Sequence, residues 1–138
     1  MDLRKISDRF SVSPQIAPGD VPAIAAAGFR SIICNRPDNE ERGQPEVALV
    51  EAAAVDAGLA FRTIPISGGA VSQADLDAFR GALDTLPGPI LAYCRSGTRC
   101  TMLWSIAQFG QMPPEDIVSA AAAAGYDMSG LVAQLGRG

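Results

Sequence analysis

The segment from Cys94 to Arg99 carries the residue types most able to do chemistry in this chain. It follows the apolar run 89–93, which predicts a buried strand, and it precedes residues 100–107, whose pattern predicts a helix. A cysteine in a polar loop between a strand and a helix lies where backbone N–H groups converge. These donors and the positive helix end favour a thiolate and an oxyanion beside it. The sequence therefore predicts Cys94 as a nucleophile and Arg99 as its catalytic partner.

The residues between these two complete an anion-binding loop. We expect the backbone N–H groups of Ser96, Gly97 and Thr98 to hold an anionic intermediate. Gly97 allows the backbone to turn where a side chain would block it. Arg95 is a further candidate for binding the charged group of a donor, with a solvent-facing side chain as the alternative.

The chain contains three cysteines and no histidine. Without histidine, Ser-His-Asp and Cys-His catalysis are excluded, and so is most zinc catalysis. The number of cysteines is odd, and their spacing shows no zinc-type pairing. We therefore expect no metal and no cofactor. Free thiols in a chain of this kind are typical of a reduced, cytoplasmic protein.

Other residues near this loop have two interpretations each. Cys100 is either a small residue at the helix start or a resolving thiol that forms a disulfide with Cys94 or accepts its sulfur. Cys34 is flanked by apolar residues and is expected to be a core thiol. Arg36 and Asp38 are expected to form an ion pair that braces their loop, with substrate contact as the alternative.

Length and composition bound the class of protein. With 138 residues, 48% of them apolar and 19% charged, the chain is expected to form one globular catalytic domain over residues 1–138. A net charge of −4 without a basic run gives no reason to expect nucleic-acid binding. No signal peptide and no membrane span are predicted.

Short apolar runs alternate with helical patterns along the chain. Strands are predicted at 10–12, 31–34, 61–66 and 89–93, and helices at 21–27, 46–57, after the capping box 72–75, at 100–107 and in the tail up to residue 135. This alternation predicts an α/β fold: three layers, with a mostly parallel sheet of four or five strands flanked by helices. The carboxyl ends of the strands, one of which carries Cys94, are where function is expected.

The pattern Cys-x-x-Gly-x-Arg resembles two groups of cysteine enzymes. Rhodanese-type sulfurtransferases use a loop of six residues counted from the cysteine, as here, whereas cysteine-dependent phosphatases use the longer Cys-x5-Arg loop. Over most of its length the chain is also similar to one bacterial family, the phosphatase-like domain of beta-lactamase-hydrolase-like proteins. The matching stretches are Ser13-Pro14-Gln15, residues 28–33 leading to Asn35-Arg36-Pro37-Asp38, Gly43-Gln44-Pro45, Ile64-Pro65-Ile66 and residues 92–99.

This resemblance implies a fold like that of dual-specificity phosphatases, carrying a loop of rhodanese length. It also implies an association with sulfur dioxygenases, which such domains often accompany or are fused to. A sulfur dioxygenase is therefore a candidate partner of this chain.

The choice of reaction depends on the loop and on the leaving group. The loop is one residue shorter than in phosphatases, and no carboxylate follows Ile64-Pro65-Ile66 until Asp75. Phosphoester cleavage normally requires an acid to protonate the leaving oxygen, whereas sulfite and thiolates leave as stable anions. These points favour a sulfurtransferase that takes sulfane sulfur from thiosulfate or glutathione persulfide as a Cys94 persulfide and passes it to a thiol acceptor.

Two alternatives remain open. The first is a cysteine-dependent phosphatase of the tyrosine or dual-specificity kind, with a Cys94 thiophosphate intermediate and Asp38 or Asp75 as the acid. The second is a module that binds oxyanions or senses thiols without catalysis.

Overall fold

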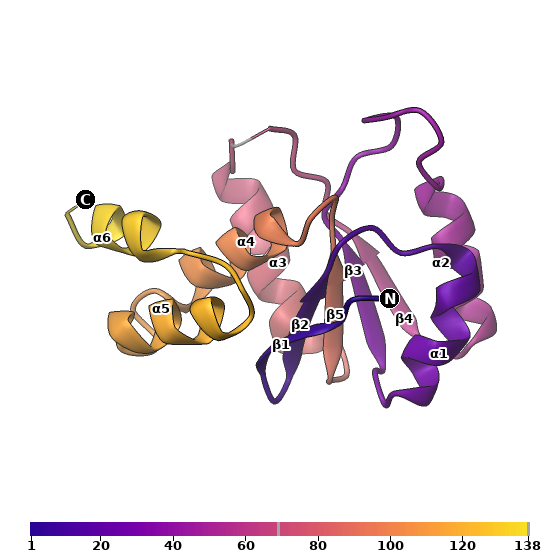
Figure 1. The fold of residues 1–138 in the computed structure, drawn as a ribbon, viewed down its shortest axis with the longest axis horizontal. Coiled ribbons are helices and arrows are strands. Elements are labelled where there is room, and N and C mark those ends of the chain that lie inside the picture. The colour runs from indigo at the N-terminus through magenta and orange to yellow at the C-terminus, as the bar shows by residue number, and fades with distance from the viewer. Residues whose placement is uncertain (69, 138) are drawn as a thin grey trace.

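A five-stranded sheet in the order β1-β2-β5-β3-β4 forms the centre of the fold (Figure 1). The structure, a computed structural model, describes residues 1–68 and 70–137. The strands are β1 (Arg4–Ser7), β2 (Phe10–Ser13), β3 (Ser31–Cys34), β4 (Ala60–Thr63) and β5 (Ile90–Tyr93). Four of them run parallel, and only β1 pairs antiparallel, with β2. This arrangement confirms the predicted mostly parallel sheet.

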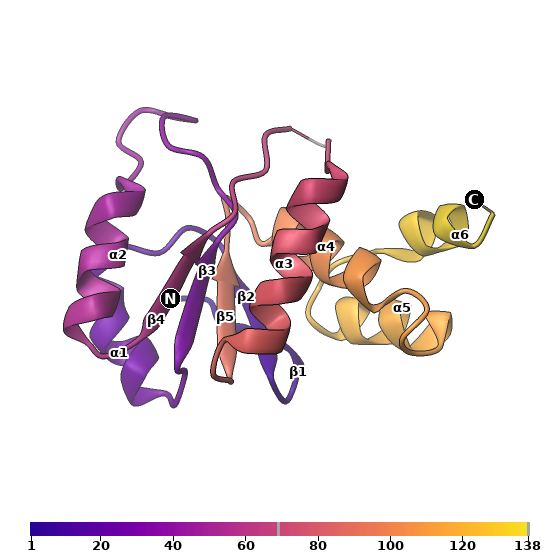
Figure 2. The same cartoon turned by 180° about the vertical axis from the view of Figure 1, so that it is seen from behind.

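Helices cover both faces of the sheet and complete the three layers (Figure 2). One face carries α1 (Val21–Ala26), which follows the short 3-10 turn η1 (Pro18–Asp20), and α2 (Val47–Asp56). The other face carries α3 (Gln73–Thr85) and α4 (Thr98–Gln108), with α5 (Pro114–Ala123) and α6 (Ser129–Arg137) beyond them. No helix in the described part of the chain is long and apolar enough to cross a membrane.

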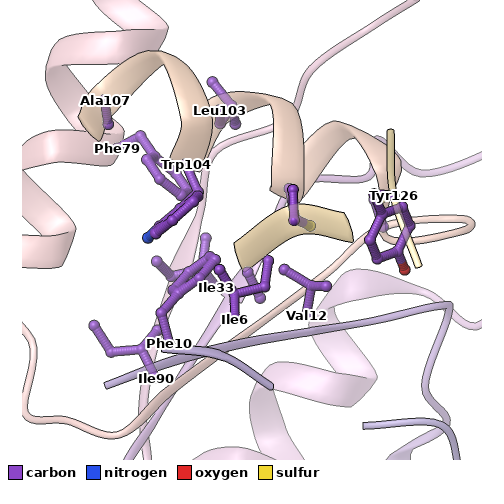
Figure 3. Packing of buried hydrophobic residues seen from close by; sticks show 14 of the residues in the cluster. Ile6, Phe10, Val12, Ile33, Phe79, Ile90, Leu103, Trp104, Ala107 and Tyr126 are labelled. Carbon is purple, nitrogen blue, oxygen red and sulfur yellow. The ribbon is translucent and has the colours of Figure 1, made fainter. Parts of the chain in front are cut away.

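The core on the α3 and α4 face is organised around Phe10 (Figure 3). Its ring lies edge-to-face on Phe79, with centroids 5.9 Å apart, and stacks on Trp104 with centroids 6.4 Å apart. All three side chains are buried. Since Phe10 belongs to β2 and Trp104 to α4, this contact fixes α4 against the sheet and thereby fixes the loop that joins β5 to α4.

Two of the structure's strands differ from the prediction. The strand predicted at 61–66 ends at Thr63, because Pro65 has no N–H to continue a ladder. The N–H groups of Ile64 and Ile66 still bond the carbonyls of Cys34, the last residue of β3, and of Asn35. Strand β1 was not predicted, because its four residues mix polar and apolar side chains without a strand pattern. The Ser72 capping box is confirmed by hydrogen bonds in both directions with Asp75. The connection predicted at 67–70 includes Gly69, which lies outside the described residues.

Candidate active site

Cys94 lies directly after β5, and α4 begins four residues later at Thr98. The backbone turns at Gly97, whose φ of 90° is a left-handed conformation that suits glycine. This turn directs the Gly97 N–H to the Cys94 sulfur at 3.1 Å. The Cys94 side chain is fully buried. The loop therefore holds the cysteine sulfur against backbone donors at the start of a helix, as its position in the sequence predicts.

The surroundings of Cys94 favour its thiolate. A hydrogen bond from the Cys100 thiol, helped by the backbone N–H groups of Cys100, Ser96 and Gly97, lowers the pKa of Cys94 to about 5 against the opposing effect of burial. The pKa of Cys100 is raised by burial and by its contact with Cys94, so Cys100 stays protonated and acts as the donor. Cys94 is consequently in its nucleophilic form at neutral pH.

Arg99 is held in place by two segments far from it in sequence. Its Nη1 and Nη2 donate to the two carboxylate oxygens of Glu40, each at 2.7 Å, and Nη1 also donates to the carbonyl of Ile66 at 2.7 Å. Among the described residues the Nε–H of Arg99 has no partner. This bidentate pair orients the guanidinium and leaves a donor available to a ligand.

Glu40 also binds a second arginine, which is buried. Arg36, 1% exposed, donates from Nε to Glu40 at 2.8 Å, from Nη2 to Glu41 at 3.1 Å and from Nη1 to Gln15 at 3.0 Å. Arg99 above all, and then Arg36, lower the pKa of Glu40 to about 2. One carboxylate therefore connects the buried Arg36 to Arg99.

The ion pair predicted between Arg36 and Asp38 is wrong. The carboxylate of Asp38 instead accepts the backbone N–H of Val47 at 2.9 Å, where α2 begins. Glu40 and Glu41 bind Arg36 instead, because the loop turns back over Arg36. Residue spacing alone does not reveal this turn. Asp75 likewise bonds Ser72 at the start of α3. Both carboxylates proposed as phosphatase acids are thus bound at helix starts.

The remaining predicted loop residues lie at the rim of the site. Arg95 is 67% exposed, and its Nη2 lies 3.5 Å from Glu41. The hydroxyl groups of Ser96 and Thr98 are exposed and share a hydrogen bond of 2.9 Å. Cys34 is buried and donates its thiol to the carbonyl of Arg36 at 3.2 Å, as expected for a core thiol.

Sequence reasoning missed several residues that contact the loop. Gln15 belongs to a segment that also bonds the loop backbone, since its N–H donates to the carbonyl of Arg95 at 3.2 Å. Glu40 and Glu41 stood in a polar loop with no pattern to single them out. The hydroxyl of Tyr126, which comes after α5, donates to the carbonyl of Ser96 at 2.8 Å. Nothing local in the sequence points to that contact.

Known proteins resemble this chain in sequence and in fold. The family model "Beta-lactamase hydrolase-like protein, phosphatase-like domain" matches residues 2–111. A beta-lactamase hydrolase-like protein of Xylella fastidiosa is 36% identical over 139 residues, which cover 99% of this chain and 32% of that protein. Its counterpart in Agrobacterium fabrum is 35% identical over 130 residues, 93% of this chain and 30% of that protein. The chain thus spans about a third of the length of these relatives.

Solved structures agree with this assignment. A phosphatase-like protein of Neisseria meningitidis has a TM-score of 0.87 and 34% identity, with 99% of this chain and 98% of that chain covered. The kinase associated phosphatase superposes with a TM-score of 0.69 over 86% of this chain and 79% of its own at 13% identity, which shows a shared cysteine-phosphatase fold. The chain belongs to the family of phosphatase-like domains of beta-lactamase hydrolase-like proteins, as the motifs 13–15, 35–38 and 92–99 had indicated.

Proposed function

We propose that this domain is a cysteine-dependent phosphatase-like hydrolase in which Cys94 is the nucleophile. The observation that carries the proposal is the buried Cys94 sulfur, bonded by the Gly97 N–H at the start of α4 beside an arginine fixed by Glu40. Membership of a phosphatase-like family supports phosphoryl chemistry ahead of the sulfur transfer that the loop length and the missing acid favoured. Fold by itself does not decide the reaction, so the site residues must.

The reaction would proceed in two displacements. The Cys94 thiolate attacks the phosphorus of a phosphate monoester, so that the S–P bond forms as the ester P–O bond breaks and the alcohol oxygen leaves with the bonding pair. The backbone N–H groups of the loop and the Nε–H of Arg99 bind the phosphoryl oxygens as charge develops on these oxygens. Water then attacks phosphorus, the S–P bond breaks, and phosphate and the Cys94 thiolate are released.

The carboxylates of the site narrow the substrate class. Asp38 and Asp75 are bound at helix starts, and Glu40 is kept ionised by its arginines, so none of the three is held as a proton donor. A leaving group must then depart as an anion or take its proton from water. We therefore expect aryl esters and phosphoanhydrides, whose leaving groups are weakly basic, to react faster than alkyl esters.

Sulfur transfer is the second candidate, and the same lack of an acid favours it. Here the Cys94 thiolate attacks the outer sulfur of thiosulfate, an S–S bond forms, and sulfite leaves with the electrons of the broken S–S bond. An acceptor thiolate then takes the outer sulfur and regenerates Cys94. The Cys-x4-Arg spacing, one residue tighter than the phosphatase pattern, suits a single sulfur atom better than a phosphoryl group.

Intact-protein mass spectrometry distinguishes these reactions. The reduced protein is incubated with an aryl phosphate, and in parallel with thiosulfate or glutathione persulfide, and is then quenched in acid. A phosphoryl adduct with ester turnover, absent in Cys94→Ser and present in the buried-thiol control Cys34→Ser, would support the phosphatase. A one-sulfur adduct that a thiol removes, without a phosphoryl adduct, would replace it with sulfur transfer. If neither adduct forms, the remaining interpretation is a module that binds oxyanions or senses thiols without catalysis.

A further inference from the structure

The peptide unit between Ser96 and Gly97 is bonded at both ends. Its N–H, on Gly97, donates to the Cys94 sulfur at 3.1 Å. Its carbonyl, on Ser96, accepts the hydroxyl of Tyr126 at 2.8 Å. In a trans peptide the N–H and the C=O point in opposite directions, so a partner on one end fixes the direction of the other. The Tyr126 hydroxyl thereby determines where the Gly97 N–H points.

Tyr126 is itself held by elements outside the loop. Its backbone N–H bonds the carbonyl of Ala121 in α5 at 2.9 Å. The Arg4 guanidinium of β1 lies 5.1 Å from the centroid of its ring and also donates to the carbonyl of Ala124 at 3.3 Å. The ring is buried and belongs to the same hydrophobic cluster as Phe10 (Figure 3). Its hydroxyl is therefore a fixed donor rather than a mobile one.

Gly97 is shaped to accept this contact. A Cβ added at Gly97 would overlap the Tyr126 hydroxyl, and the φ of 90° would strain any side-chain-bearing residue. The loop thus approaches Tyr126 as closely as a backbone can. This close approach agrees with the hydrogen bond from the Tyr126 hydroxyl to the Ser96 carbonyl.

We propose that Tyr126 is a positioning residue, which keeps the Gly97 N–H on the Cys94 sulfur by binding the Ser96 carbonyl. Tyr126 lies beyond residues 2–111, the part of the chain that the family model matches. The inference rests on the proposed role of Cys94 as the nucleophile. Without the hydroxyl, the peptide is free to rotate and to turn its carbonyl dipole toward the thiolate, which disfavours the charged form.

Other groups facing Cys94 would not change with Tyr126. They are the thiol of Cys100 and the guanidinium of Arg99, both from α4, and the thiol of Cys34 from β3. None of these contacts the Tyr126 hydroxyl. If removal of that hydroxyl changes the ionisation of Cys94, the change therefore reports the orientation of the Ser96–Gly97 peptide.

The test is the pH profile of Cys94 alkylation in Tyr126→Phe, which keeps the ring and removes only the hydroxyl. Iodoacetamide rates are measured on the folded protein, with the modified cysteine located by peptide mass spectrometry. We expect the midpoint, near pH 5 in the unaltered protein, to rise by about one unit. Tyr93→Phe is the matched control, because it removes the hydroxyl of the other tyrosine, which bonds no part of the loop.

An unchanged midpoint in Tyr126→Phe would overturn the proposal, and so would an equal rise in Tyr93→Phe. A second measurement leaves the Tyr126 hydroxyl in place. When 3-fluorotyrosine is incorporated into the Tyr93→Phe variant, Tyr126 alone is labelled, and its hydroxyl becomes a stronger donor. The midpoint is then expected to fall slightly, and a rise would contradict the positioning role. Alkylation uses no substrate. A shifted profile without any phosphoryl or sulfur adduct would therefore refute the proposed function and leave the positioning role standing.

Discussion

Replacing Glu40 by glutamine should destabilise the protein through both of its arginines. The two Glu40 oxygens accept three hydrogen bonds, two from Arg99 and one from Arg36. Glutamine keeps one acceptor and places an NH2 group against guanidinium donors. It also removes the negative charge beside two guanidinium groups that are 16% and 1% exposed. The Glu40 side chain is 25% exposed, so solvent screening reduces the loss to about 2 kcal/mol.

The pH dependence identifies the carboxylate as the cause. Because the pKa of Glu40 lies at about 2 in the folded protein and at 4.5 ordinarily, its stabilisation is complete above pH 4.5 and is lost as the pH falls toward 2. Urea denaturation of the unaltered protein and of Glu40→Gln should differ by about 2 kcal/mol at neutral pH, and by less than half of that at pH 3. The melting temperature at neutral pH should fall by about 6 °C.

A matched control is Glu51→Gln, a change of the same kind at an exposed position of α2. It should alter stability by less than about 0.5 kcal/mol. Equal stability of Glu40→Gln and the unaltered protein at neutral pH would contradict the stabilising role of the Glu40 carboxylate, and so would a deficit of the same size at pH 3. Turnover should also decline in Glu40→Gln, since Arg99 loses the carboxylate that orients it.

Three further changes test other parts of the structure. Cys100→Ala should raise the pKa of Cys94, so the midpoint of the pH profile of Cys94 alkylation moves to a higher pH. Cys100→Ser should restore most of this pH profile, because the serine hydroxyl supplies another donor. Gly97→Ala should abolish turnover in a protein that still folds by circular dichroism, because the added Cβ overlaps the Tyr126 hydroxyl. Normal turnover there would show that the loop is not closely packed. Phe79→Ala should cost about 4 kcal/mol in urea denaturation, and a loss under 1 kcal/mol would show that the core collapses around the gap.

The parts of the site that could be predicted are those encoded locally. Cys94, Gly97 and Arg99 lie within six residues, between a strand and a helix that their own patterns predict. A turn between a strand and a helix brings backbone donors close to the cysteine, as the Gly97 N–H shows. The alternation of strands and helices likewise predicted the parallel sheet, because its period does not depend on distant contacts.

The contacts that could not be predicted join distant segments. Arg99 and Glu40 are 59 residues apart, and Tyr126 and Ser96 are 30 apart. Among the acidic residues after β3, sequence gives no means of choosing the partner of Arg36, because that choice depends on how the loop folds back. Strand β1 was missed for a similar reason, since it is stabilised by pairing with β2 rather than by its own composition.

The low pKa of Cys94 has a consequence for the newly made chain. The donors that hold the thiolate lie in the β5–α4 turn and in the first turn of α4, and this region is shaped by β2, by the loop after β3 and by Tyr126. Before these segments meet, Cys94 is an ordinary thiol with a pKa near 9.0 and is almost entirely protonated at neutral pH. Folding itself therefore converts Cys94 to its thiolate, and in an unfinished chain the protonated thiol is less reactive toward oxidants and electrophiles.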